Sequence, residues 1–394
     1  MTRLLRVLLL ACVLLSVAVA AAVWFLSYPA RPGRFFDAAA PAGTPPGVML
    51  AAQPYEKDLP AGAEARRILY TTTLSDGLPA TASALVIWKP GTGNAGPRRT
   101  IAWAPGTAGA APGCGVSLQG EPFHMIPDLP ELLEAGWVLV GTDYAGLGTK
   151  GPHPYLIGQG EARSVLDAVR AARGLDEVSL APETLVWGHS QGGHAALWAG
   201  MIAGDYAPDI DLRGVAAFAP ASDVPALLSA IGATPSGRLF SSYVARAYGD
   251  TYADVSFDSI VRPGARWPAR EVAKRCLSLN GTAVSAFLAQ NMKGSIFAEG
   301  NAAFEAHLKD NVPAGPFGVP LLIVQGEADD VVSAAMQAAY AARLCASGET
   351  VDFISLPGHS HVSIILPGAP SLPLLMDWSA ARFDGAPAPS TCAP

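Results

Sequence analysis

Apolar and polar positions alternate between two kinds of segment along most of the chain. Short runs that are almost entirely apolar predict buried strands at 65–73, 81–90, 100–105, 136–144, 184–188, 214–220, 319–326 and 351–358. Stretches that predict helices separate them, at 126–136, 160–174, directly after 190, and at 333–347. Strands that alternate with helices are typical of a mostly parallel sheet with helices on both faces, so the predicted fold class is α/β. The short turn at 74–80 favours an antiparallel pairing of the first two strands.

This alternation stops between residues 223 and 318. Helical pieces separated by Pro and Gly fill the segment, and we expect no strand in it. Such an insertion between two core strands predicts a helical cap over the edge where the strands end, because ligands bind at that edge in open α/β sheets. The predicted core is therefore formed by residues 29–222 and 319–394. At its start, residues 29–60 are rich in Pro, Ala and Gly, which predicts a linker or a strap lying over the domain.

The first residues predict export of the protein. Arg3 and Arg6 precede an apolar run, residues 7–26, that contains no charge. This is the pattern of a secretory signal, and the run is also long enough to span a bilayer. We expect residues 1–28 to be a signal peptide or a signal anchor. Either one makes the body secreted, periplasmic or otherwise extracytoplasmic, and the second leaves it anchored to the membrane by 7–26.

Charge and cysteine content limit the classes of partner and compartment. The chain has 33 acidic and 26 basic residues and a net charge of −7. A nucleic-acid-binding protein is expected to carry a basic patch, so we predict no nucleic-acid partner. Cys114, Cys276, Cys345 and Cys392 lie beyond the leader. An even number in an exported chain predicts disulfides, with three possible pairings, and four unpaired thiols are the alternative.

The sequence Gly-His-Ser-Gln-Gly-Gly at 188–193 lies between a predicted strand and a predicted helix. A Gly-x-Ser-x-Gly turn in that position is typical of the nucleophile elbow of α/β hydrolases. The glycines leave room for a tight turn that lifts the Ser190 hydroxyl above the edge of the sheet. The alternative is that Ser190 is only a small residue in a glycine-rich loop.

A serine nucleophile needs a general base and a carboxylate that orients the base, and in this fold they follow in the order acid, then histidine. Asp329 and Asp330 follow one late strand, and His359 and His361 follow the last one. We predict Asp329 as the acid because it lies nearer the strand end, with Asp330 as the alternative. We predict His361 as the base because it leaves more chain for the loop to turn toward the serine, with His359 as the alternative.

Two backbone N–H groups are candidates for stabilising an oxyanion. The N–H of Gln191 follows the serine at the start of a helix. A second donor is expected in the loop after an early strand, where Pro-Gly-Thr at 105–107 predicts Thr107; its hydroxyl could add another bond. An ordinary turn is the alternative for that loop. Asp143 ends another strand at the same edge, where it could orient loops, bond to the oxyanion segment or be purely structural.

The histidines near these motifs do not predict a metal site. His359 and His361 lie two residues apart, but no Glu or Cys with ligand spacing accompanies them. We expect neither a metal nor an organic cofactor. His189 and His194 flank the serine turn and are expected to pack rather than to react.

Several motifs together indicate a family. They are APGTAGAAPGCGVSL (104–118), GTDYAGLG (141–148), HPYLIG (153–158), LDAVRAAR (166–173), GHSQGGHAALWA (188–199) and QGEADDVV (325–332). Over roughly residues 35–380 the chain resembles the secretory lipase family, the fungal lipase A type with bacterial members, within the α/β-hydrolase superfamily. The resemblance implies that Ser190, Asp329 and His361 form the triad and that the insertion is a lid. It also implies two disulfides, Cys114–Cys276 and Cys345–Cys392.

The resemblance implies a serine-dependent carboxylic ester hydrolase, in the first place a secreted triacylglycerol lipase. Its partner would be a small-molecule ester or a lipid, with the cap contacting the lipid interface. The family often has Tyr before the serine, so His189 and Gln191 are departures that keep a short-chain esterase as an alternative. A peptidase or an acyltransferase on the same triad is a further alternative. The last one is a non-catalytic, lipid-binding protein with the hydrolase fold.

Overall fold

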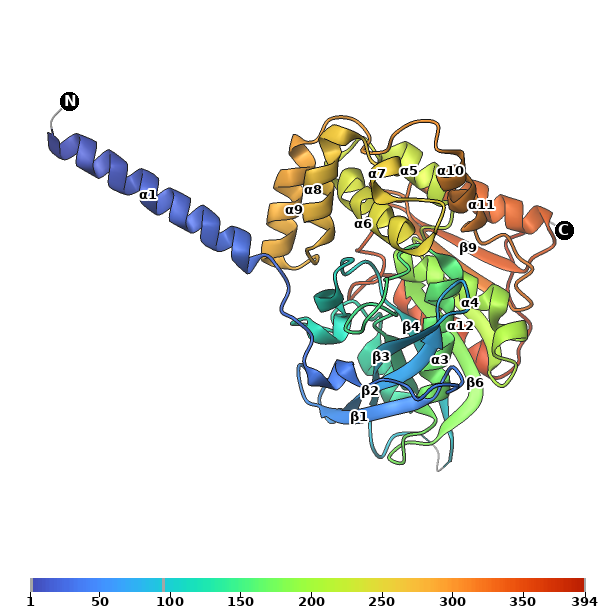
Figure 1. Ribbon diagram of the computed structural model, residues 1–394. Helices are drawn as coiled ribbons and strands as arrows, with labels where there is room; N and C mark the ends of the chain where they lie inside the picture. The colour runs from blue at the N-terminus through green and yellow to red at the C-terminus, as the bar shows by residue number, and fades with distance from the viewer. Residues whose placement is uncertain (1–2, 94–95, 393–394) are drawn as a thin grey trace.

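A nine-stranded sheet forms the centre of the protein (Figure 1). The structure is a computed structural model that describes residues 3–93 and 96–392. The strand order across the sheet is β1-β2-β3-β5-β4-β6-β7-β8-β9. The strands are β1 (Met49–Tyr55), β2 (Glu64–Thr73), β3 (Pro79–Trp88), β4 (Arg98–Ala104), β5 (Val138–Thr142), β6 (Leu180–His189), β7 (Asp211–Phe218), β8 (Leu321–Gly326) and β9 (Val351–Leu356).

Strand pairing divides the sheet into an antiparallel edge and a parallel body. β1, β2 and β3 pair antiparallel in chain order, and β3 pairs antiparallel with β5. All pairs from β5 through β4, β6, β7 and β8 to β9 are parallel. The predicted α/β class is confirmed, as is the antiparallel pairing of the first two predicted strands.

Helices cover both faces of the sheet. On one face they are α3 (Gly158–Ala172), α4 (Gln191–Tyr206) and α11 (Ala334–Ala346), and on the other α2 (Leu129–Glu134) and α12 (Ser371–Phe383). Successive side chains of a strand pack on opposite faces of the sheet. In β4, Ile101 and Trp103 belong to one hydrophobic core, and Ala102 and Ala104 belong to the other. Because side chains alternate across a sheet that is buried on both faces, the parallel strands are apolar throughout.

Two elements differ from the sequence prediction. The linker or strap expected for residues 29–60 contains a strand, β1, which pairs with β2 at the edge of the sheet. Pro54 is tolerated in β1 because an edge strand needs backbone partners on one side only. The helix α12 was not predicted either, although it buries Leu375 and Trp378 against the sheet. Both elements depend on contacts with distant strands more than on their own sequence pattern.

The chain between β7 and β8 is helical, and residues 219–320 are described without a gap. It forms α5 (Val224–Ile231), α6 (Pro235–Thr251), α7 (Phe257–Ile260), α8 (Pro263–Ala273), α9 (Leu279–Asn291) and α10 (Ala302–Asp310), and none of its residues belongs to a strand of the sheet. We call residues 223–318 the helical insertion. It has a hydrophobic core of its own, in which Tyr243, Tyr248 and Val272 are buried.

Two disulfides join distant segments. Cys114–Cys276 links the loop after β4 to the helical insertion across 162 residues of sequence, and Cys345–Cys392 links α11 to the C-terminal segment. Both pairings implied by the family resemblance are confirmed. The bond between Cys114 and Cys276 joins the insertion covalently to the core. A cross-link over a long loop also lowers the entropy of the unfolded chain, which stabilises the folded state.

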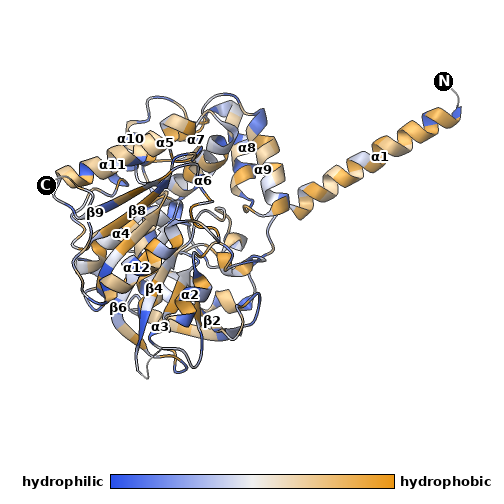
Figure 2. Cartoon of the chain, turned by 180° about the vertical axis from the view of Figure 1, so that it is seen from behind, coloured by the Kyte–Doolittle hydropathy of each residue, from blue (hydrophilic) through white to orange (hydrophobic). Residues whose placement is uncertain are grey.

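An apolar helix, α1 (Arg3–Leu26), projects from the body (Figures 1 and 2). None of its residues is buried, and by length and composition it could cross a membrane. Packing against the body begins at its C-terminal end, where Trp24 contacts the core of the helical insertion and Ser27 is buried. The predicted leader, residues 1–28, therefore ends in residues that belong to the packed body.

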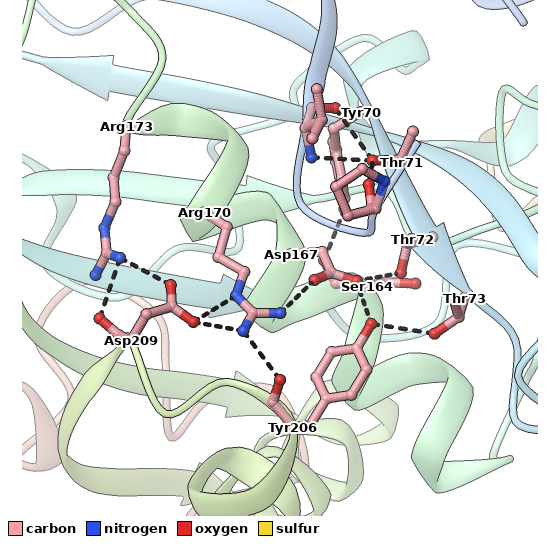
Figure 3. A network of polar contacts seen from close by, with 12 residues as sticks. Tyr70, Thr71, Thr72, Thr73, Ser164, Asp167, Arg170, Arg173, Tyr206 and Asp209 are labelled. Carbon is pink, nitrogen blue, oxygen red and sulfur yellow. Dashed lines mark hydrogen bonds and ion pairs between the residues drawn. The ribbon is translucent and has the colours of Figure 1, made fainter. Parts of the chain in front are cut away.

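A buried carboxylate joins α3 to β2 and α4 (Figure 3). Asp167 is fully buried and accepts hydrogen bonds from the hydroxyl groups of Thr72, at 2.8 Å, and Tyr206, at 2.7 Å. Arg170 lies 3.3 Å from its other oxygen. Burial raises the pKa of Asp167 to about 6, although these contacts favour the charged form.

We expect this carboxyl group to make stability depend on pH. An unfolded Asp has a pKa of about 3.9, so the folded state binds the Asp167 proton more tightly. Its stabilising contribution is complete below about pH 4 and is lost as the pH rises through about 6, by roughly 1–3 kcal/mol. Urea unfolding between pH 4 and 7 should show this slope in the wild type and not in Asp167→Asn. Equal slopes in the two proteins would contradict the assignment.

Candidate active site

The turn after β6 has the geometry of a nucleophile elbow. Ser190 lies between β6 and α4 with φ 57° and ψ −117°, a conformation that residues other than glycine rarely adopt. A Cβ on Gly192 would lie 1.8 Å from the carbonyl oxygen of Ala104, and one on Gly188 would lie 2.0 Å from the carbonyl oxygen of Gly192. No other residue fits at either position, so the glycine pattern is a steric requirement of this turn.

The structure brings Ser190, His361 and Asp329 together in one chain of hydrogen bonds. The Oγ of Ser190 lies 2.9 Å from Nε2 of His361, and Nδ1 of His361 lies 2.7 Å from Oδ2 of Asp329. The three residues follow β6, β9 and β8 at one edge of the sheet. When Nδ1–H donates to Asp329, Nε2 is free to accept the proton of the serine hydroxyl.

Asp329 is fixed by several donors besides the histidine. Its Oδ1 accepts the backbone N–H groups of Val331 and Val332, each at 2.8 Å, and its Oδ2 accepts the side-chain amide of Gln325 at 2.9 Å. Burial raises the pKa of Asp329, but the hydrogen bonds from His361 and the two backbone amides outweigh it and hold the pKa below its usual value. The carboxylate is therefore charged at neutral pH, as a group that orients an imidazole must be.

The two alternative residues lie outside this chain of hydrogen bonds. Nδ1 of His359 lies 3.2 Å from the hydroxyl of Ser363, and its carbonyl accepts the N–H of Ala328 at 2.9 Å. Asp330 is exposed at the edge of the cavity, and its side chain has no hydrogen bond with any residue that the structure describes. The geometry thus favours the predicted residues over their neighbours.

The predicted oxyanion donors come from two different segments near the serine. Gln191 is the first residue of α4, where backbone N–H groups have no acceptor within the helix. Thr107 lines the same cavity as Ser190, and its hydroxyl lies 3.0 Å from that of Tyr155. Gly106 allows this loop to approach the serine turn, since a Cβ there would lie 3.2 Å from the ring of His189.

His189 connects the serine turn to the loop that carries His361. Its Nε2 lies 2.8 Å from the carbonyl oxygen of His361. Because a carbonyl oxygen only accepts, His189 donates from Nε2 and is held in that tautomer. Burial and the nearby His361 lower the pKa of His189 to about 3, so the ring is neutral at physiological pH. Sequence reasoning predicted that His189 packs, but no sequence signal indicated this bond.

A second buried network lies beneath the start of α4. Glu161, which no motif singled out, accepts the side-chain amide of Gln191 at 2.7 Å and the N–H of Leu156 at 3.0 Å. Its other oxygen lies 2.9 Å from Nδ1 of His194, whose Nε2 lies 2.7 Å from the carbonyl oxygen of Asn311. Nε2 carries the proton that it donates to that carbonyl. A hydrogen bond between Nδ1 of His194 and the oxygen of Glu161 therefore needs a second proton, which lies between these two atoms. The network ties the serine turn to the end of the helical insertion.

Asp143 organises the loop that carries the first disulfide. It is buried and accepts the hydroxyl of Ser83 at 2.6 Å, and the N–H and hydroxyl of Ser117 at 2.7 and 2.6 Å. Burial raises the pKa of Asp143 above its usual value, against these hydrogen bonds, which lower it. Of the predicted roles, the contacts fit that of a residue that orients a loop at this edge of the sheet.

A cavity of about 480 Å³ opens beside the serine. Ser190 and His361 line it from the core, and Phe240 and Leu277 line it from the helical insertion. Further apolar side chains complete much of its wall: Trp103, Val116, Pro122, Met125, Val331 and Val362. An apolar chain can therefore lie next to the serine hydroxyl.

The chemistry that these side chains offer is nucleophilic and acid–base. Both ring nitrogens of His361 are engaged, one by Ser190 and one by Asp329. Within residues 3–93 and 96–392, no three His, Cys, Asp or Glu side chains are grouped so that they could hold a metal ion.

Solved structures share this fold. Candida antarctica lipase A in its closed state matches with a TM-score of 0.75 and 17% identity, over 92% of this chain and 87% of that one. The rice cell wall degrading esterase LipA of Xanthomonas oryzae matches with a TM-score of 0.64 and 19% identity, over 86% of this chain and 97% of that one. At such low identities the likeness shows the α/β-hydrolase fold.

Similar sequences occur in fungi and bacteria. The secreted triacylglycerol lipase LIP7 of Malassezia globosa is 27% identical over 356 residues, which are 84% of this chain and 73% of that protein. A Mycobacterium tuberculosis protein described as a probable inactive lipase is 27% identical over 268 residues, 65% of this chain and 57% of that protein. This chain likewise spans only 58% of the length of a Candida albicans lipase and 54% of that of an Arthroderma benhamiae lipase.

A family model gives the classification. The model described as Secretory lipase matches residues 115–391. This range includes the turn around Ser190, the helical insertion, and the loops that carry Asp329 and His361. The chain belongs to the secretory lipase family.

Proposed function

We propose that this protein is a serine-dependent carboxylic ester hydrolase, a secreted lipase that acts outside the cytoplasm. The observation that carries the proposal is the hydrogen-bonded chain of Ser190, His361 and Asp329 beside an apolar cavity. Membership of the secretory lipase family supports the same class. The apolar N-terminal helix and the two disulfides fit an exported chain, because disulfides persist in oxidising compartments.

In the first half of the proposed reaction, Oγ of Ser190 attacks the carbonyl carbon of the ester and its proton moves to Nε2 of His361. The π electrons of the carbonyl group move onto its oxygen, which becomes an oxyanion. Asp329 keeps the ring in place and stabilises the imidazolium that forms. When the tetrahedral intermediate collapses, the bond between the acyl carbon and the oxygen of the leaving alcohol breaks. His361 gives its proton to the oxygen of that alcohol. The acyl group is left on the serine.

In the second half, a water molecule takes the place of the alcohol. His361 accepts a proton from it as its oxygen attacks the acyl carbon. Collapse of the second tetrahedral intermediate breaks the bond to Ser190, and the proton on His361 passes to the serine oxygen. A carboxylic acid leaves, and the starting state is restored. This sequence uses no group beyond the side chains named and water, so no cofactor enters it.

The oxyanion formed in both halves would lie between the N–H groups of Gln191 and Thr107. Gln191 directly follows Ser190 and begins α4, and Thr107 lines the same cavity as Ser190, which supports this assignment. Fixed donors of this kind act on charge that appears only in the transition state, and loss of one costs roughly 10²–10³ in kcat. The bond between the Gln191 side chain and Glu161 would keep the first donor in position.

We propose the helical insertion, residues 223–318, as a cap or lid on a core formed by residues 29–222 and 319–394. Phe240 and Leu277, which come from the insertion, line the cavity beside the serine. An apolar wall on both sides suits the acyl part of a lipid ester, and one relative is named a secreted triacylglycerol lipase. The cap would then also be the part of the protein that meets a lipid interface.

Two kinds of alternative remain as second candidates. One relative is described as a probable inactive lipase, which favours a non-catalytic, lipid-binding role as the candidate from another class. A short-chain esterase, a peptidase or an acyltransferase would use the same triad, and one structural neighbour is an esterase. Rates on esters of different chain length and on amides separate these possibilities.

The Ser190→Ala variant should lose roughly 10⁴–10⁶-fold in kcat on p-nitrophenyl esters, because it removes the nucleophile and leaves the oxyanion donors in place. We would measure wild type and variant on a series from acetyl to stearoyl esters, with thermal unfolding as the control for folding. A maximum at long chains indicates a lipase, and activity on the shortest esters alone indicates an esterase. A variant that keeps more than a trace of activity contradicts the proposal.

The neighbouring residues His359 and Asp330 serve as controls for the assignments of His361 as the base and Asp329 as the acid. His361→Asn should lower kcat by roughly 10⁴–10⁶-fold and Asp329→Asn by roughly 10⁴-fold. His359→Asn should stay within about tenfold of wild type, because the side chain of His359 contacts Ser363 and not the triad. Asp330→Asn should behave like His359→Asn. The assignment is wrong if either control loses as much activity as its neighbour.

A further inference from the structure

Only the C-terminal end of the N-terminal helix α1 packs against the body that the structure describes. The helix contains 24 residues, none of them buried, and Figure 2 shows it as apolar over almost its whole length. At about 1.5 Å per residue it spans about 36 Å, slightly more than the roughly 30 Å hydrocarbon core of a bilayer. Arg3 and Arg6 lie at its far end, which favours a cytoplasmic N-terminus and places the body on the outer side.

The near end of α1 is clamped to the helical insertion by a buried arginine. Arg275 is 0% exposed, and its guanidinium carbon lies 4.2 Å from the ring centroid of Trp24 and 4.1 Å from that of Tyr28. Its Nε donates to the hydroxyl of Ser27 at 2.7 Å. Glu271 accepts from Arg275 at 3.1 Å and from the hydroxyl of Tyr28 at 2.6 Å. These contacts hold α1 in one orientation relative to the helical insertion, whereas a flexible linker would allow many orientations.

The same contacts fix the direction in which α1 leaves the body. The ring of Trp24 stacks on that of Trp267 in α8, with centroids 6.0 Å apart and planes 3° apart. Figure 1 shows the end of α1 against α8 and α9 of the helical insertion. A membrane crossed by α1 would therefore meet the protein near these two helices.

α8 and α9 expose three large apolar side chains. Trp267 is 61% exposed, Leu279 is 89% exposed and Phe287 is 65% exposed. We call these three residues the interfacial patch. Large exposed apolar side chains carry a cost in water, and Trp in particular is enriched at the level of lipid headgroups. Trp267 stacks on Trp24 of α1, and Leu279 lines a cavity together with Pro29, Ala30 and Arg31, so two residues of the patch lie beside the point where α1 joins the body.

The catalytic cavity opens toward this same region. A second cavity, of about 660 Å³, is lined by Pro29, Ala30 and Arg31, which follow α1, and by Leu279 of the interfacial patch. It shares four lining residues with the cavity beside Ser190: Gln119, Glu121, Met125 and Leu277. The path to the serine therefore begins next to the point where the chain would enter the membrane.

We propose that α1 remains attached as a membrane anchor, and that the substrate is an acyl lipid of the bilayer that enters the active site from the membrane surface past residues 29–31. The proposal rests on the ester hydrolase function proposed above. It names the source of the substrate: the outer leaflet of the membrane that holds the enzyme. Soluble esters reach the same serine without using this path.

The test compares two substrates on the full-length protein reconstituted in phosphatidylcholine vesicles. One is a fluorogenic diacylglycerol within the vesicle membrane, and the other is soluble p-nitrophenyl butyrate. A first variant replaces the interfacial patch by Trp267→Ser, Leu279→Ser and Phe287→Ser. A second variant carries four added Leu residues and then a flexible Gly-Ser linker between Ala22 and Val23, so that the apolar run keeps its length and the clamp is intact, but the orientation of the anchor is free.

In both variants we expect the ratio of the vesicle rate to the soluble rate to fall about tenfold or more, because orientation at the interface is lost and the serine is untouched. The matched control is Leu78→Ser with Leu374→Ser, two exposed apolar residues outside the patch, and it should leave the ratio unchanged. An unchanged ratio in the two test variants overturns the proposal, as does a mature protein whose N-terminus lies between residues 18 and 24. Failure of the wild type on both substrates overturns the proposed hydrolase function instead.

Discussion

The close approach of three backbone segments at the end of β6 is the constraint on which the site depends. Gly192 packs on the carbonyl of Ala104 at the end of β4, and a Cβ on Gly193 would lie 2.8 Å from Pro220, just after β7. The ends of three neighbouring parallel strands are thus fixed relative to one turn. Because Ser190 is held at positive φ within that contact, the direction of its Cα–Cβ bond is fixed, and the loops after β8 and β9 need only reach its hydroxyl.

The loops that surround the serine are held by buried polar groups that do not take part in the proposed reaction. Asp143 fixes the loop after β4, His189 fixes the backbone of His361, and Glu161 connects the side chain of Gln191 to His194. Each of these groups is buried and paired, and an unpaired polar group in such a position would cost about 1–3 kcal/mol. The order of the site is therefore a property of the whole strand edge and not of the triad alone.

Local sequence patterns predicted the parts of the structure that are locally determined. The glycine turn around Ser190 is one of these, because the steric limits act within a few residues, and the parallel strands are apolar because both faces are buried. β1 and α12 were missed because their stability comes from β2 and from the far face of the sheet. The role of Glu161 could not be predicted either, since two of its partners, Gln191 and His194, lie 30 or more residues away in sequence.

The clamp around Arg275 determines where a soluble form of the protein can begin. A form that starts at residue 29 would lack Trp24, Ser27 and Tyr28, and would leave a fully buried guanidinium without two aromatic faces and one acceptor. Arg275 precedes Cys276, which is bonded to Cys114 in the loop after β4, and lies two residues before Leu277, which lines the cavity beside Ser190. A truncated enzyme intended for solution work or crystallisation should therefore retain the chain from residue 23 onward.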